Sequence, residues 1–381
     1  MKQACRATRL IFLAFGMSIA SWVPMVPFIK SRLMLDDAQF GLLLFVCGVA
    51  TSFVLPLSGW LVKRFGSCLM IGISCILGLI LLPMLTIAPT LFYLGIVLFL
   101  SGGANAVMSI AINAQAIAVE HRSNQSLMSS FHCLFSVGNF LGVMFIGLLL
   151  EFNLRFFCCA VLLSIFIALI IASQWKNLQP DESPIDSSQA PRGIIERRVF
   201  LLGFFYLVAL ISEGSMLNWS AEFLNSSFNY SNAHAGIGYA LFSIAMTGGR
   251  LLGDRIVSRF GQLMTLQISC LLGAIGFVIL VTALWPYAEL IGCLLIGLGS
   301  SNIVPILLSL SGKFRKTAPH YALAIVISFG HAGSLMGPVL VGFIANAFSL
   351  GLAFGCIAAM LFVIGLLGSP LVLKPSRNNI N

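Results

Sequence analysis

Long apolar runs alternate with short polar loops along most of the chain. A helix needs about 20 apolar residues to cross a membrane. Seven runs free of Asp, Glu, Lys and Arg are long enough, at 10–29, 38–62, 123–150, 156–175, 223–249, 260–288 and 290–312. Two longer runs, 65–119 and 317–373, break near Pro89 and Gly351 into two spans each, and 199–221 is a span with one acid, Glu213. The pattern predicts twelve transmembrane helices.

The composition supports a membrane protein. Only 9% of the residues are charged, 59% are hydrophobic, and the mean hydropathy is +1.02. Soluble domains carry about 25% charged residues, so a soluble globular protein is excluded. Nearly all of the ten cysteines lie in apolar runs, and none forms a CxxC pair. We therefore expect small buried hydrophobes, with no metal site, cofactor or disulfide framework.

The positive charges predict an orientation. Of the 21 Lys and Arg residues, all but four fall on one side of the twelve spans; the exceptions are Lys30, Arg32 and Arg155 on the other side and Arg250 within a span. Cytoplasmic loops of membrane proteins carry this excess, so both termini are expected in the cytoplasm. The net charge of +9 is spread over separate loops and indicates no nucleic-acid partner.

A repeat divides the chain into two halves. Residues 57–66 (LSGWLVKRFG) recur 195 positions later as 252–261 (LGDRIVSRFG), with five of the ten positions identical. The same offset pairs Gly138, Gly142 and Gly147 with glycines at 333, 337 and 342. Such glycines, in small-xxx-small spacing, allow close helix packing in lipid. A parallel repeat of this kind is typical of transporters.

The longest polar stretch separates the two copies. Residues 176–198 are rich in proline and charge, which is typical of a solvated linker. We predict an N-terminal six-helix bundle over 1–175, a cytoplasmic linker over 176–198 and a C-terminal six-helix bundle over 199–381.

The spans and the repeat together resemble the major facilitator superfamily. Gly59, Lys63, Arg64 and Gly66 are similar to that family's loop motif G-x-x-x-D-R-x-G, although Lys63 stands where the acid is usual. In the second copy Ser258 occupies the acid position. The resemblance implies an all-α fold of twelve helices in two six-helix repeats, and a monomeric secondary transporter that works by alternating access.

Shorter stretches indicate a subgroup. The segments 20–22 (ASW), 111–115 (AINAQ), 131–132 (FH), 213–219 (EGSMLNW) and 248–250 (GGR) resemble the YbjJ-like bacterial group near the fucose-permease branch. This resemblance implies the bacterial inner membrane and gives no substrate.

Ionisable residues inside spans are costly, so each is a functional candidate. Glu213 lies about 21 Å into its span and is predicted to be the proton-coupling or substrate-contacting acid. His331, near the middle of its span, and His132, about one turn nearer the cytoplasm, can relay protons or bind substrate. For all three residues, structural packing is the alternative.

Charged residues near the cytoplasmic ends predict an inner gate. Arg250 and Asp254 are four residues apart and share one helix face. With Arg255 and Arg259 they are expected to form ion pairs that break when the protein opens to the cytoplasm. Lys63 and Arg64 are the counterpart in the first half, and positive-inside anchoring is the alternative for them.

Neutral polar and aromatic residues are candidates for the cavity lining. The family's first, fourth, seventh and tenth helices surround its cavity, which favours four asparagines in this chain: Asn105, Asn113, Asn218 and Asn302. Asn139, in the fifth span, is a further candidate, and helix–helix hydrogen bonding is the alternative for all five. Trp22 and Trp219 either stack on a substrate ring or belong to the interfacial aromatic belt.

These observations favour a proton-coupled carrier of a small organic solute. Import by symport is the first choice, on the resemblance to the fucose-permease branch. The glycine–proline pair that efflux antiporters of this superfamily carry in the fifth helix is also absent there, since Gly142 is followed by Val143. A drug or metabolite efflux antiporter is the alternative within transporters, and a transporter-like membrane sensor is the alternative outside them. No HExxH, GxSxG or Walker-type pattern indicates an enzyme.

Overall fold

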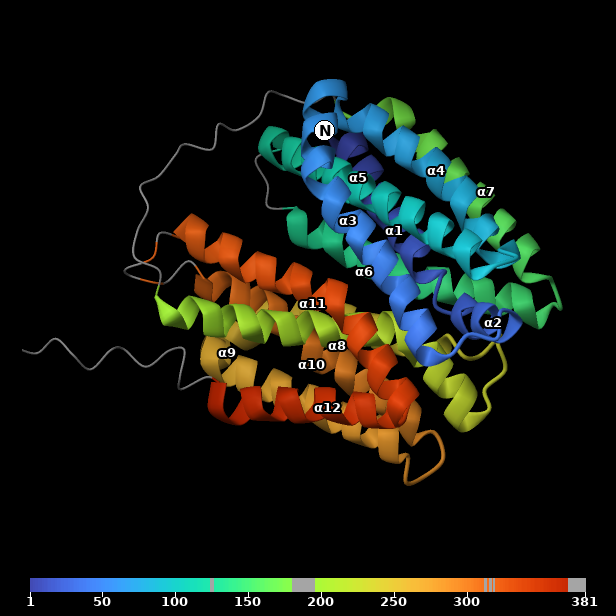
Figure 1. Cartoon of the computed structure of the whole chain (residues 1–381). Helices are drawn as coiled ribbons and strands as arrows, with labels where there is room; N and C mark the ends of the chain where they lie inside the picture. The colour runs from blue at the N-terminus through green and yellow to red at the C-terminus, as the bar shows by residue number, and fades with distance from the viewer. Residues whose placement is uncertain (124–126, 180–195, 312–313, 315–316, 318, 369–381) are drawn as a thin grey trace, which may run out of the picture. The chain divides into compact units, whose positions relative to one another are not determined.

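The structure is a computed structural model that describes residues 1–123, 127–179, 196–311, 314, 317 and 319–368. Within these ranges the chain is helical, with short turns and no strand (Figure 1). Most of the predicted linker, 180–195, lies outside them. The chain forms two compact units, Met1–Asp186 with Leu217–Ser243, and Ser187–Met216 with Ile244–Asn381. We call them unit 1 and unit 2.

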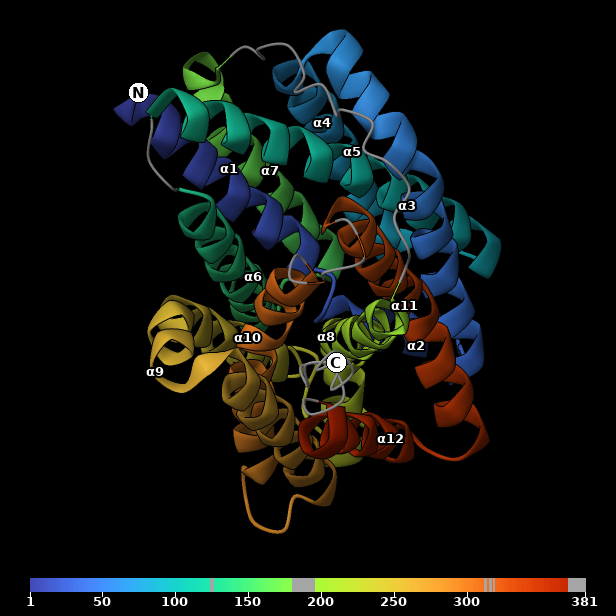
Figure 2. The same ribbon diagram turned by 90° about the vertical axis from the view of Figure 1, so that its left-hand side faces the viewer.

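Unit 1 contains the first six spans. The first span is divided between α1 (Lys2–Ala20) and the short α2 (Met25–Arg32), with Pro24 at the start of α2. Five helices follow: α3 (Asp37–Phe65), α4 (Ser67–Ile87), α5 (Leu91–Ser123), α6 (Met128–Glu151) and α7 (Phe156–Gln174). A 3-10 turn, Trp175–Asn177, ends the sixth span. Helix α1 packs on α5, α6 and α7, so the first span lies inside this bundle (Figure 2).

The second half continues with five long helices. They are α8 (Arg197–Phe228), α9 (Ile237–Thr282), α10 (Ala288–Ser311), α11 (Pro319–Ala347) and α12 (Leu350–Val363), which ends in a π-helical turn, Ile364–Gly368. Helix α8 belongs to unit 2 as far as Met216, and α9 belongs to unit 2 from Ile244 onward.

The helices account for twelve spans. Ten helical segments of the described chain are long and apolar enough to cross a membrane. The shorter apolar helix 350–366 is an eleventh. The first part of α9 is a twelfth. It is less apolar than the other spans because it carries Arg250, Asp254 and Arg255. The predicted all-α fold of twelve helices is confirmed.

The repeated loop motif adopts the same backbone conformation in both copies. Gly66, between α3 and α4, has φ 86° and ψ 149°, and Gly261, inside α9, has φ 77° and ψ 160°. Side-chain-bearing residues rarely enter this region of the backbone map, so only glycine joins the two helices there without strain. Helix α9 is thus two spans that meet at Gly261.

The paired glycines bring helices together in each unit. In unit 1, a Cβ on Gly138 or Gly142 of α6 would collide with the backbone of Leu13 or Met17 on α1. In unit 2, a Cβ on Gly333 of α11 would collide with the Leu207 backbone on α8. Close helix packing, predicted for these glycines from their spacing, is confirmed at these three positions.

Candidate functional site

Two charged side chains meet inside unit 2. Glu213 lies on α8 and Arg250 lies on α9, and Glu213 Oε1 is 3.8 Å from Arg250 Nη2. The side chains are only 22% and 28% exposed, respectively. Burying either charge alone in a membrane span is costly, and the opposite charge offsets part of that cost. The structure therefore joins two residues that the sequence offered as separate candidates.

The Glu213 carboxylate is incompletely satisfied. Its Oε1 atom is buried and, among the described residues, accepts no hydrogen bond. The distance of 3.8 Å to Arg250 is too long for a hydrogen bond. Buried polar atoms normally have a partner, so this oxygen is suited to accept a proton or a donor group of a solute.

Tyr206 belongs to the same cluster. It lies seven residues before Glu213 on α8, which places both on one helix face, and it interacts electrostatically with both Glu213 and Arg250. Its ring packs against Gly330 of α11, where a Cβ would collide with it. Tyr206 is not among the candidates predicted from the sequence, although its spacing of seven residues from Glu213 is a signal that indicates it.

The two histidines have local partners. His331 on α11 is exposed, and its Nδ1 lies 3.0 Å from the Ile327 carbonyl of its own helix. A carbonyl only accepts, so Nδ1 donates and Nε2 of the neutral ring is left as an acceptor. His132 on α6 is exposed, and its ring meets that of Phe12 edge-on at 5.4 Å. Neither of these two contacts involves Glu213.

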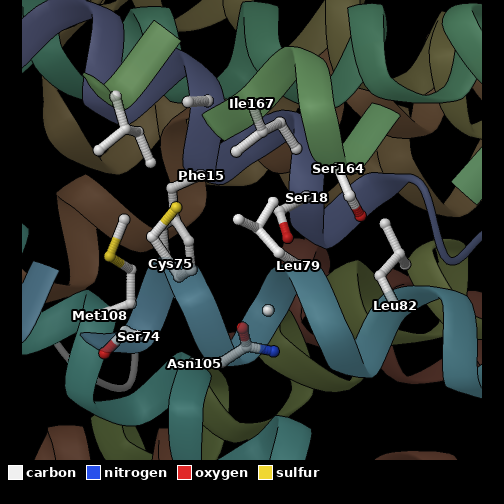
Figure 3. Close-up of a pocket in the computed structure, with 13 residues that line it drawn as sticks. Phe15, Ser18, Ser74, Cys75, Leu79, Leu82, Asn105, Met108, Ser164 and Ile167 are labelled. Atoms are coloured by element: carbon white, nitrogen blue, oxygen red, sulfur yellow. The ribbon is translucent and has the colours of Figure 1, made fainter. Parts of the chain in front are cut away.

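One asparagine lines a small cavity in unit 1. Asn105 of α5 faces the space between α1, α4, α5 and α7, together with Ser18, Ser74 and Ser164 (Figure 3). The space available to the centre of a water-sized sphere is ≈ 30 Å³. That is room for one or two water molecules and too little for an organic solute.

The other asparagines differ in their surroundings. Asn113 donates from Nδ2 to the Ser109 carbonyl of its own helix at 2.8 Å. Asn302 is buried and lies against Gly249 and Gly253, which binds α10 to α9. Asn139 is buried, and its Oδ1 accepts no hydrogen bond from the described residues. Asn218 is half-buried on α8.

The two candidate tryptophans flank one phenylalanine in unit 1. The Trp22 ring stacks on Phe40 at 6.1 Å, and Trp219 meets Phe40 edge-on at 5.2 Å. Trp219 is fully buried, and its Nε1 donates no hydrogen bond to the described residues. Protein atoms therefore cover the Trp219 ring in this structure.

The predicted inner-gate residues are largely exposed. Lys63, Arg64, Arg255 and Arg259 all lie on the surface. None of these four forms an ion pair within the described part of the chain. Gly59 is exposed with open space around it, Gly66 ends α3, and the side chain of Asp254 lies outside the described residues. The gate role thus stays a prediction.

A further charged cluster was missed by the sequence analysis. Lys30 at the end of α2 contacts Asp37 at the start of α3, and its Nζ lies 2.6 Å from Glu222 Oε1 on α8. Lys30 and Glu222 are each only 12% exposed. All three residues belong to unit 1. Their positions at the ends of spans made them look like solvated loop charges, although each is largely buried.

Comparison with known proteins shows the family. The model of the Major Facilitator Superfamily matches residues 10–320. An uncharacterized MFS-type transporter of Yersinia pestis is 38% identical over 94% of this chain and 93% of its own length. The membrane protein MosC of Rhizobium meliloti is 27% identical over 95% of this chain and 87% of its own length.

Solved structures show the same fold. The nucleoside transporter NupG aligns with a TM-score of 0.74 at 16% identity, covering 98% of this chain and 100% of NupG. A bacterial homologue of the human lysosomal transporter Spinster, inward-facing and occupied, aligns with a TM-score of 0.70 at 14% identity over 97% and 93% of the two chains. At such identities the likeness concerns the fold alone. With the family match and the 38% identical relative, the chain belongs to the major facilitator superfamily and is a multi-pass membrane transporter.

Proposed function

We propose that this transporter imports a small organic solute together with protons across the bacterial inner membrane, with both termini in the cytoplasm. Glu213 is the proton-binding residue, and Arg250 is its counter-ion. Tyr206 and Asn302 contribute to solute binding. We also propose that, within the superfamily, the chain belongs to the YbjJ-like group near the fucose-permease branch.

One observation carries this proposal: Glu213 Oε1 is buried, accepts no hydrogen bond from the described residues and lies 3.8 Å from Arg250 Nη2. A carboxylate fully bound by donors would gain little from a proton. This one has an unused acceptor and a counter-charge beyond hydrogen-bonding distance. Proton binding neutralises Glu213 and therefore weakens its attraction to Arg250. The change is large because two charges attract each other more strongly in an apolar surrounding than in water.

The consequence is a coupled exchange of partners. When Glu213 is protonated, Arg250 has lost its counter-charge and offers its donors to the solute. When the solute leaves, the ion pair favours release of the proton. A polar or anionic solute with several acceptor groups fits this chemistry. The orientation rests on the positive-inside distribution of Lys and Arg.

The test begins with a ligand. A thermal-shift screen of the purified protein against sugars, nucleosides, amino acids and carboxylates identifies solutes that bind the folded state, because such binding raises its apparent stability. Uptake of the best solute is then measured in proteoliposomes with the outside either more acidic or more alkaline than the inside. Symport predicts accumulation only with the acidic outside.

The alternatives give different results. A proton-driven antiporter accumulates the solute only when the inside of the vesicle is the more acidic compartment, because protons that leave the vesicle drive the solute in. A sensor binds the solute in the screen and moves none across the bilayer in either gradient. Either result overturns the proposal.

A further inference from the structure

An apolar groove runs along the outside of unit 1 between α3, α4 and α5. Twelve of its thirteen lining residues are apolar or glycine, and Ser74 is the exception. Its free space is ≈ 460 Å³. Six large side chains on its walls are 42% to 51% exposed: Phe65, Leu69, Ile73, Leu77, Phe99 and Leu100. Such a surface requires an apolar occupant.

The length of the groove matches one lipid leaflet. On α3 the lining residues extend from Val54 to Phe65, which is about 16 Å at 1.5 Å per residue. Half of a hydrocarbon core of about 30 Å is about 15 Å. The groove therefore extends from the end of α3 to about the middle of the bilayer. An acyl chain anchored at that end has the right length and chemistry to fill it.

Positive charge lies at one end of the groove. Arg64 follows the lining residue Leu61 by three positions and directly precedes Phe65, so it stands beside the groove on the helix surface. Lys63 is next to it. Both are exposed and form no ion pair within the described ranges.

The helix that forms the second wall adds to this charge. Helix α4 begins at Ser67, immediately after Gly66, and Leu69 in its first turn lines the groove. The N-terminus of a helix carries a partial positive charge that favours anions. No acidic residue is among those that line the groove. The end of the groove beside Arg64 and the start of α4, which we call its mouth, thus attracts an anion. The rest of the groove accepts only hydrocarbon.

We propose that this groove binds one anionic phospholipid, with its phosphate at Arg64 and Lys63 and one acyl chain along α4 and α5. An uncharged or zwitterionic lipid fills the same space, but its headgroup binds more weakly to Arg64 and Lys63. The site lies outside the Glu213–Arg250 pair, so it is independent of the proposed proton coupling.

Competition in native mass spectrometry tests the proposal. The purified full chain is stripped of lipid and offered equal amounts of dioleoyl phosphatidylglycerol and dioleoyl phosphatidylcholine. The wild type is expected to retain one phosphatidylglycerol preferentially. K63Q/R64Q should lower this preference by up to about thirtyfold, since each of the two cations near an anionic lipid is worth about 1 kcal/mol. R64K should restore most of what R64Q loses.

The repeat offers a matched control for charge. R255Q/R259Q also removes two exposed cations near the second copy of the motif. If general attraction of anionic lipid to basic loops explains the preference, both double variants reduce it equally, which contradicts the proposal. Inorganic phosphate alone is expected to compete with neither lipid, because it has no chain to fill the groove.

Filling the groove tests the acyl chain. Gly103 lies on the groove floor, where an added Cβ would be 3.4 Å from Val54 Cγ2. G103L is expected to reduce retention of both lipids, whereas G355L on α12, where a Cβ meets nothing within 4 Å, leaves it unchanged. Each variant is first checked for a monodisperse elution profile. Unchanged lipid retention in folded G103L overturns the proposal, as does a shift from dimer to monomer that shows a second copy to be the occupant.

Discussion

The pair α1 and α6 in unit 1 and the pair α8 and α11 in unit 2 pack in the same way and differ in chemistry. The glycine contacts align α1 with α8 at an offset of 194, since Leu13 corresponds to Leu207. At that offset Ile19 occupies the position of Glu213. At the offset of 195 that relates the two loop motifs, Leu55 occupies the position of Arg250. The packing surface is thus shared, whereas the charged pair occurs in the second copy alone.

The packing itself shows one exchange between the copies. In unit 1, Gly16 on α1 lies against the Phe135 backbone of α6. The corresponding residues in unit 2 are Leu210 on α8 and Gly330 on α11, so the glycine has changed helix. The space that Gly330 leaves holds the ring of Tyr206, which lies beside the charged pair. The exchange explains how unit 2 accommodates a tyrosine where unit 1 has Phe12.

The largest expected effect is on the shared packing. G138L and G333L each place a side chain where the partner helix has backbone, so each should lose about 3 kcal/mol or more of folding stability. Thermal unfolding of the purified variants in one detergent measures the loss, with G355L as the control in open space. A loss of stability in only one of the two variants would show that the two helix pairs do not pack in the same way.

The second expected effect concerns the charged pair. E213Q keeps the shape of the side chain and removes its proton exchange. With about one pH unit across the membrane, one coupled proton supports about tenfold accumulation, because one unit corresponds to about 1.4 kcal/mol. In E213Q the ratio of internal to external solute should fall to about one, while solute binding in the thermal-shift assay persists. If E213Q accumulated the solute as the wild type does, Glu213 would not be the proton-coupling residue.

The third prediction concerns the cluster missed by the sequence analysis. K30Q leaves Asp37 and Glu222 as two largely buried carboxylates without a counter-charge. The variant should lose about 2 kcal/mol of stability, and K30R, which keeps the positive charge, should lose less. Thermal unfolding of both variants measures this. An equal loss in K30Q and K30R would show that Lys30 acts through packing alone.

The smallest expected effect is at the repeated turn. G66A and G261A each force a residue with a Cβ into the same unfavourable backbone region, at a cost of about 1 kcal/mol. The two losses should agree within about 0.5 kcal/mol. Thermal unfolding measures both, and a clear inequality would indicate that the two turns differ in their surroundings.

The sequence predicts the features that depend on local pattern. Long apolar runs give the spans, and the duplicated Gly66 and Gly261 mark the same turn in both copies. Glu213 stands out because an acid in an apolar run is costly. Its pairing with Arg250 and the contribution of Tyr206 depend on how α8, α9 and α11 pack, which no single run reveals. Lys30 follows the apolar run 10–29, and the sequence gives no sign that α2 continues past it to Arg32 or that its partners are Asp37 and Glu222.

The most direct measurement of the central claim is proton movement during solute uptake. Unbuffered proteoliposomes that contain the wild-type protein are given the identified solute, and the external pH is recorded. Solute-dependent alkalinisation in the wild type, absent from E213Q and unaffected by G355L, is the predicted result. Equal alkalinisation by E213Q, or solute uptake by the wild type without any change in pH, would contradict the assignment of proton coupling to the Glu213–Arg250 pair.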